Sequence, residues 1–124
     1  MVKKKYNLIL SVESKNYRMT IGLDVVRILG CPQYTTFKVK KDMSYLTIYP
    51  CKEKEEPSFK VPDKFFIHEH CSYRINSKSF VSGLYTTNQL DEQKNYYFIG
   101  IYSKDKNAVI FDMKDSKMKN VSDT

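Results

Sequence analysis

The sequence contains no tryptophan, and it is poor in glycine, proline and cysteine, with four, four and three residues in a chain of 124. The four glycines form no phosphate-binding loop and no dinucleotide fingerprint, which argues against the enzyme classes that depend on them. The cysteines, Cys31, Cys51 and Cys71, are odd in number and widely spaced, so they give no disulfide framework. We therefore expect a reduced protein of the cytoplasm.

The sequence also lacks any apolar run near the roughly 20 residues that a membrane-spanning helix needs. Residues 1–5 are basic, but residues 6–12 are too short and too polar for the core of a signal peptide. The segment from His68 to Cys71 holds two histidines, a glutamate and a cysteine, yet a zinc site needs a further ligand that no nearby residue supplies. No signature pairs a nucleophile with a base. The sequence thus predicts no membrane contact, no metal, no cofactor and no enzymatic activity.

Positive charge and tyrosine are what the sequence has in excess. It carries 21 Lys and Arg residues against 14 Asp and Glu, a formal net charge of +7, together with ten tyrosines and seven phenylalanines. A basic surplus favours a polyanion or an acidic protein as partner, although lysines also simply keep a protein soluble. With 41% hydrophobic residues, the composition predicts one folded domain over residues 1–124, richer in strands than a helical bundle.

The first half of the sequence alternates between apolar and polar residues in four short runs. Residues 6–12 and 17–21 predict two strands that form a hairpin with a basic tip, and residues 34–39 and 45–49 predict two more. Between these pairs, residues 23–29 show a helical spacing of apolar residues. The Gly-Cys-Pro that follows them ends that helix, because glycine adopts positive φ and proline cannot continue it.

An internal repeat relates the two halves of the sequence. At an offset of 56 positions, the segment Tyr17-Arg18-Met19-Thr20 matches Tyr73-Arg74-Ile75-Asn76. The second copy then predicts a short helix over residues 78–85 and strands over residues 95–102 and 108–113. In both copies the order is strand, short helix, hairpin.

These patterns divide the single domain into four parts. Residues 6–50 form the first half-repeat, residues 51–62 a charged linker bracketed by prolines, residues 71–113 the second half-repeat, and residues 114–124 a polar tail.

The stretch from Arg18 to Leu29 resembles the core of the AbrB/MraZ family of swapped-hairpin transcription factors. Residues 13–15 resemble the family's acidic turn that ends in lysine, and residues 45–50 resemble the closing strand of the MraZ half-unit. MraZ-like chains hold two such halves in one polypeptide. The resemblance implies an α+β fold, a swapped-hairpin small β-barrel made of two β-α-β-β half-repeats with short helices.

This sequence departs from the family pattern at three positions. Gly22 stands where the family has proline, and the glycine that precedes the family's arginine is absent, with Asn16-Tyr17 in its place before Arg18. The second copy has Gly83 where the first has Arg27.

By the same resemblance, Lys15, Arg18 and Arg27 occupy DNA-facing positions, and Arg74 and Lys78 are their counterparts in the second half. Arginine contacts guanine or phosphate in bidentate fashion, and lysine neutralises phosphate. The resemblance therefore implies a DNA-binding transcriptional regulator with double-stranded DNA as its partner, and we expect a homodimer or a larger ring. The alternative for the arginines is a solvated strand position or an ion pair inside the barrel.

A protein-binding module is the rival function, for instance an antitoxin-like factor or an inhibitor encoded by a phage or mobile element. The tyrosines leave both functions open, since aromatic side chains beside lysines stack on single-stranded nucleic acid, form protein-binding surfaces, or are half-buried in strands. The tyrosines that interleave with lysines are Tyr45, Tyr49, Tyr85, Tyr96, Tyr97 and Tyr102.

Overall fold

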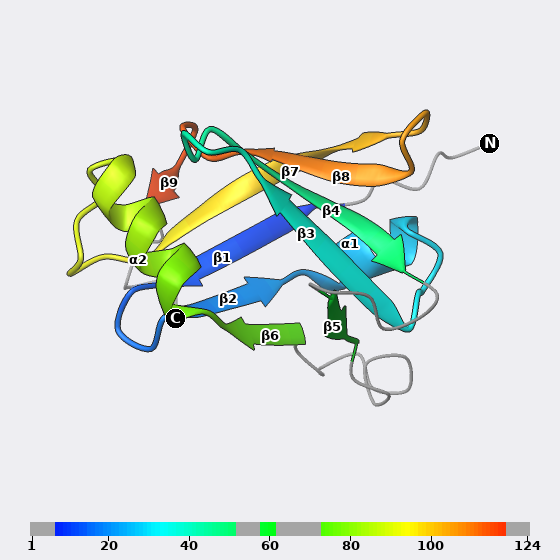
Figure 1. Ribbon diagram of the computed structural model, residues 1–124, viewed down its shortest axis with the longest axis horizontal. Helices are drawn as coiled ribbons and strands as arrows, with labels where there is room; N and C mark the ends of the chain where they lie inside the picture. The colour runs from blue at the N-terminus through cyan, green and yellow to red at the C-terminus, as the bar shows by residue number, and fades with distance from the viewer. Residues whose placement is uncertain (1–6, 52–57, 62–72, 119–124) are drawn as a thin grey trace.

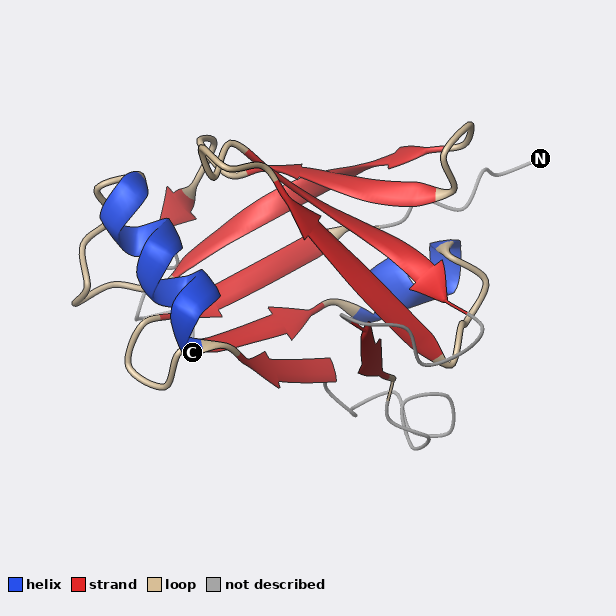
Figure 2. Cartoon of the chain, viewed as in Figure 1, coloured by secondary structure: helices blue, strands red, loops and turns tan. Residues whose placement is uncertain are grey.

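The computed structural model describes residues 7–51, 58–61 and 73–118, and these residues form a small α+β protein. Antiparallel strands wrap into a nearly closed barrel of eight strands, and the two helices of the described part lie at opposite ends of it (Figure 1, Figure 2). The α+β class expected from the sequence is confirmed. The elements, in chain order, are β1 (Ile9–Glu13), β2 (Arg18–Ile21), α1 (Leu23–Ile28), β3 (Tyr34–Val39), β4 (Tyr45–Cys51), β5 (Ser58–Lys60), β6 (Tyr73–Asn76), α2 (Lys78–Thr87), β7 (Tyr96–Ser103), β8 (Ala108–Asp112) and β9 (Lys117–Met118).

The strands follow the order β5-β3-β4-β8-β7-β1-β2-β6, and neighbouring strands in this order are antiparallel. The short strand β9 pairs with β7 outside this path. Because β5 and β6 stand at the two ends of the order, they flank the gap that remains in the barrel, which we call the seam. Strands that are distant in sequence pair directly, β2 with β6 and β4 with β8, so the two halves of the chain are interleaved.

The barrel interior is built by the alternating residues that the sequence pattern predicts. Successive side chains of a strand point to opposite faces, so every second residue of β1, β2 and β6 is buried, as are Leu46 and Ile48 of β4. Burying this apolar surface is the main force that holds the strands together. The largest fully buried side chains are Tyr73, Phe98, Phe111, Leu10, Met19, Ile21, Leu46, Ile48, Leu84, Met113, Val12 and Val25.

The two helices begin and end for different chemical reasons. Helix α1 follows Gly22 without a side-chain cap, and Gly30 ends it with φ +88. Helix α2 is four residues longer and is capped by Ser77, whose Oγ accepts a hydrogen bond from the backbone N–H of Phe80 at 3.3 Å. Within the described ranges neither helix has the length and apolarity that crossing a membrane requires.

Two boundaries expected from the sequence need correction. The segment expected as a linker, residues 51–62, contains the last residue of β4 and all of β5, which pairs with β3, and Val61 after it is buried. The segment expected as a polar tail, residues 114–124, contributes β9, which pairs with β7. Strands of three and two residues are too short to show an alternating pattern, so charged neighbours hid both of them.

Candidate nucleic-acid interface

The strongest cluster of predicted site residues lies on the outer face of the β2–β6 pair. Arg18 lies opposite Asn76, and Arg74 lies opposite Thr20, so the two arginines are diagonal neighbours on adjacent strands. Their neighbours Met19 and Ile75 point into the core, which turns the arginines outward. The alternation of buried and less buried residues along β2 and β6 therefore places both guanidinium groups on the outer face of the barrel.

No carboxylate of the described residues forms an ion pair with either arginine. Arg18 lies opposite Glu13 of β1, yet no ion pair within 4 Å joins Arg18 or Arg74 to a carboxylate among the described residues. The Nε of Arg18 is buried without a hydrogen-bond partner in the described part of the chain. An unpaired buried donor costs free energy, so an acceptor that reached this group would stabilise the site. The expected alternative of an ion pair inside the barrel is thus not what the described residues form.

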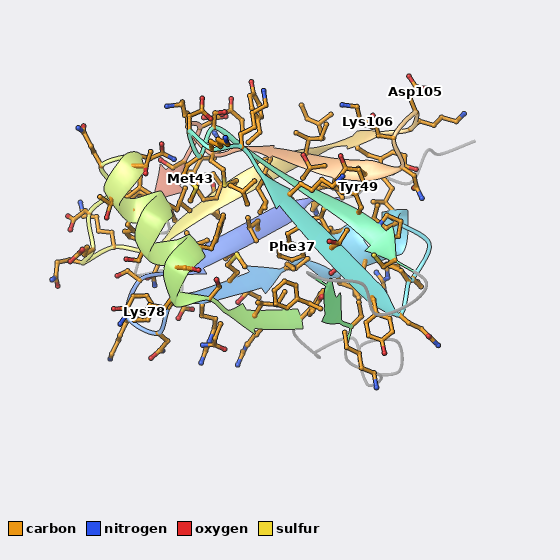
Figure 3. All side chains as sticks on the ribbon, in the orientation of Figure 1. Phe37, Met43, Tyr49, Lys78, Asp105 and Lys106 are labelled. Carbon is orange, nitrogen blue, oxygen red and sulfur yellow. The ribbon has the colours of Figure 1, made fainter. Side chains whose placement is uncertain are left out.

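Two lysines flank the arginine pair. Lys15 is exposed in the turn that joins β1 to β2, and Lys78 opens α2 with its Nζ 5.7 Å from the centre of the Tyr17 ring (Figure 3). The backbone N–H of Ser77 donates to the carbonyl of Tyr17 at 2.8 Å, which ties the turn to the start of the helix. We call the set Lys15, Arg18, Arg74 and Lys78 the arginine surface.

One border of the arginine surface is acidic. A cavity of about 500 Å³ beside the β1–β2 turn is lined by Glu13 and Glu92 as well as by Lys15 and Tyr17. The hydroxyl of Ser14 donates to the carbonyl of Glu92 at 2.6 Å and holds the two loops together there. An anion on the arginine surface is therefore repelled from the β1 border and directed toward β6.

Arg27 is not part of this cluster. It is exposed on α1, which follows the far end of β2 from Arg18, and its Nη1 lies 3.5 Å from the carboxylate of Asp24. The same carboxylate accepts a hydrogen bond from the backbone N–H of Asn7 at 2.9 Å. The structure thus brings together four of the five predicted residues and separates Arg27 from them along β2.

The backbone at Tyr17 and Gly22 has specific local requirements. Tyr17 adopts φ 48, a left-handed conformation that glycine adopts without strain. The backbone N–H of Gly22 donates to the carbonyl of Ile9 at 2.9 Å, a bond that proline cannot make. A Cβ at Gly22 would also lie 3.1 Å from that carbonyl oxygen.

The tyrosines fall into two groups that the sequence did not separate. Tyr85 and Tyr96 are buried and pack edge to face, with ring centres 5.7 Å apart. Tyr45 and Tyr49 instead point outward from β4, Tyr49 beside Lys38 of β3 and Tyr45 beside Lys40, which directly follows β3. The signal differs with the element: Tyr85 is buried with Val81 and Leu84 on one side of α2, whereas Tyr45, Tyr49 and Tyr96 are sorted by their period-2 position relative to the apolar residues of their strands.

The segment that suggested metal binding, His68 to Cys71, lies outside the described residues. Comparisons with protein-family models, with curated proteins and with solved structures find no match. The case for function therefore depends on the geometry of the surfaces alone.

Proposed function

We propose that the chain is a DNA-binding regulator with the two-half-repeat, swapped-hairpin architecture of the AbrB/MraZ type, and that the arginine surface contacts double-stranded DNA. The observation that carries the proposal is the placement of Arg18 and Arg74. They stand 56 positions apart, and the central pair of the β2–β6 register, Met19 and Ile75, stands 56 positions apart as well. A twofold axis through that central pair would exchange the two arginines.

The hairpins support two half-repeats independently. Lys38 pairs with Thr47 in the β3–β4 hairpin. The residues 63 positions later, Ile101 and Ile110, pair with each other in the β7–β8 hairpin. In the β4–β8 pair, Thr47 lies opposite Ile110, again 63 positions later. A twofold axis therefore also fits the two hairpins. The second half has seven more residues between β6 and its hairpin than the first half has between β2 and its hairpin, since the offset grows from 56 to 63 positions.

The register also extends each proposed half by one strand. β1 pairs with β7 through Leu10 and Phe98, and β5 pairs with β3 through Phe59 and Thr35. With β3 and β7 as counterparts, β1 and β5 become counterparts too. The proposed unit is therefore β-β-α-β-β, and its first strand in the second half is the segment that sequence patterns had assigned to the linker.

Duplex DNA suits this arrangement for a physical reason. The phosphates of its two antiparallel strands are related by local twofold symmetry, so a symmetric pair of arginines meets equivalent phosphates on both strands. Phosphate contacts supply most of the affinity and fix orientation, and they make binding depend on salt. The overall charge of +7 adds long-range attraction to the same partner.

The test measures binding to a labelled random-sequence duplex by fluorescence anisotropy at a series of salt concentrations. The variant Arg18→Ala/Arg74→Ala is expected to bind more weakly, with a salt slope smaller by about 0.9 for each phosphate that is no longer neutralised. The matched control is Lys104→Ala/Lys106→Ala, which removes the same charge from the turn between β7 and β8 (Figure 3). Equally weakened binding in both variants would contradict the arginine surface, and absence of duplex binding at low salt would contradict the function.

A protein-binding module is the second candidate, and one observation favours it. Ile9, Ile99 and Ile101 are 36%, 53% and 73% exposed on the outer face of β1 and β7, and Ile9 lies directly opposite Ile99. A contiguous apolar strip of this kind is typical of a protein contact. The variant Ile101→Thr would abolish partner binding under this function and would leave duplex affinity unchanged under the first.

A further inference from the structure

The outer face of the β3–β4 hairpin carries a second basic surface, away from the arginine surface. Tyr45, Thr47 and Tyr49 alternate along β4 on the side that faces away from the core. Their neighbours across the hairpin are basic. Lys38 of β3 lies opposite Thr47, and the backbone N–H of Lys40, the residue after β3, donates to the carbonyl of Tyr45 at 3.1 Å. We call these five residues the Lys–Tyr face.

Each tyrosine ring of this face has an ammonium group beside it. The Nζ of Lys38 lies 5.1 Å from the centre of the Tyr49 ring, and the Nζ of Lys40 lies 5.2 Å from the centre of the Tyr45 ring. Both distances are within the range of a cation–π attraction. The Tyr45 side chain is 40% exposed, and the two tyrosines are about 13 Å apart along the strand, at roughly 3.3 Å per residue. The face therefore offers two separate ring platforms, each with its own cation.

The nearby carboxylates are held by other groups. The Oδ1 of Asp42 accepts hydrogen bonds from the backbone N–H and the hydroxyl of Ser44, at 3.0 and 2.6 Å. Asp112, opposite Tyr45 on β8, accepts from the backbone N–H of Lys114 at 3.0 Å. The Ser44 hydrogen bonds, and after them the nearby charges of Lys114 and Lys40, lower the pKa of the Asp42 carboxyl. Among the described residues, however, no ion pair within 4 Å joins Lys38 or Lys40 to a carboxylate, so an external anion can still reach both ammonium groups.

The sheet itself does not require these residue types. Register places Ile101 and Ile110 of the β7–β8 hairpin where Lys38 and Thr47 stand in the β3–β4 hairpin. Both hairpins have the same pairing, so an apolar outer face builds the same structure. The pairing of the hairpin therefore does not require a lysine at position 38, and Lys38 calls for an explanation other than strand pairing.

We propose that the Lys–Tyr face binds single-stranded nucleic acid, with unpaired bases stacked on Tyr45 and Tyr49 and phosphates paired with Lys38 and Lys40. Every base has a flat π face, so ring platforms bind a single strand of any sequence, and lysines beside them neutralise its backbone. In a duplex the base faces are already stacked on each other, so the rings select unpaired strands. This site goes beyond the proposed function, because it uses other strands of the barrel and another form of nucleic acid.

The experiment measures binding of a fluorescein-labelled oligo-dT of about 12 nucleotides, within the usual site size of a small barrel. Tyr49→Ala and Tyr45→Ala are each expected to weaken binding at least about 5-fold, the lower end of the effect of removing one stacked base. Tyr49→Phe is the matched control, which keeps the ring and is expected to retain affinity. Tyr97→Ala, on the outer face of β7, tests whether any surface tyrosine has the same effect.

Lys38→Gln is expected to reduce the salt slope by about 0.7, the value for one phosphate of a single strand. The melting temperature of each variant shows whether its weaker binding comes from unfolding. If an alanine variant is unstable, Tyr49→Phe still tests the proposal, because it keeps the ring and must keep the affinity for oligo-dT. Equal affinity of Tyr49→Ala and Tyr49→Phe for oligo-dT, or equally tight binding of polyglutamate, would overturn the proposal. The same measurement with oligo-rU shows whether the face binds single-stranded RNA or single-stranded DNA more tightly.

The arginine surface is tested separately in the same assay. Arg18→Ala/Arg74→Ala is expected to weaken duplex binding and to leave oligo-dT binding unchanged, and the Tyr49→Ala variant is expected to do the reverse. Failure of duplex binding with oligo-dT binding intact would remove the proposed function and leave the Lys–Tyr face standing.

Discussion

Thr35 of β3 and Tyr73 of β6 form a buried hydrogen bond, with 2.6 Å between the Oγ1 and Oη atoms. Both side chains are about 1% exposed. The Tyr73 hydroxyl also donates to the carbonyl of Phe59 on β5 at 3.2 Å, so its single proton is used there and Thr35 donates to it. This pair fastens β6 to β3 and β5 across the seam, where the strand order has its two ends.

Removal of that hydroxyl is expected to destabilise the fold. Tyr73→Phe leaves the buried Thr35 hydroxyl without this partner, so we expect the free energy of unfolding to fall by about 1–3 kcal/mol. In a Thr35→Val background the same substitution is expected to cost less, because no threonine hydroxyl remains to be stranded. Urea denaturation of the four proteins measures the coupling, and additive effects would contradict it.

Alkaline pH is expected to unfold the protein through two tyrosines. Burial raises the pKa of Tyr73 to about 12, although the hydrogen bond with Thr35 lowers it, and burial and then the nearby Tyr96 raise the pKa of Tyr85 to about 12. In the unfolded chain these pKa values are about 10. The neutral forms are therefore favoured by folding, and this stability is complete below pH 10 and is lost as the pH rises toward 12.

Each of these tyrosines contributes roughly 2–3 kcal/mol to the pH dependence above its unfolded pKa. Denaturation midpoints between pH 9 and pH 12 measure the slope. The variants Tyr73→Phe and Tyr85→Phe are expected to have lower stability at pH 8 and a flatter decline at high pH. An unchanged slope in both variants would mean that other groups cause the alkaline unfolding.

The left-handed backbone of Tyr17 gives a prediction with a built-in control. Tyr17→Gly and Tyr17→Ala both remove the ring that lies beside Lys78, but only glycine adopts φ 48 without strain. The glycine variant is therefore expected to be more stable than the alanine variant by about 1 kcal/mol. Thermal denaturation of both variants measures the difference, and an alanine variant of equal or greater stability would show that the turn relaxes.

Sequence patterns predicted the longer elements well, because their burial is periodic. The runs at residues 34–39 and 45–49 became β3 and most of β4, and the helix expected at residues 78–85 became α2. The connection that holds β5 was missed, since a three-residue strand gains its stability from its partner β3 rather than from its own composition.

The candidate site was predicted in part for a similar reason. The repeat offset of 56 positions named Arg18 and Arg74 as counterparts, and strand pairing brings them together. Arg27 was grouped with them by family resemblance, but its helix lies beyond the other end of β2. The pairs that Lys38 and Lys40 form with tyrosines were not predicted, because they depend on which residues face each other across β3 and β4.

The pairing of β1 with β7 has a consequence for the order in which the chain folds. Ile9 and Ile99 are partners although 90 positions separate them, so β1 leaves the ribosome long before its second neighbour exists. Contacts this distant slow folding, because a large loop must close before they form. The nascent β1–β2 hairpin exposes an open edge for most of synthesis, and chaperones that shield such edges are expected to raise the yield of native protein.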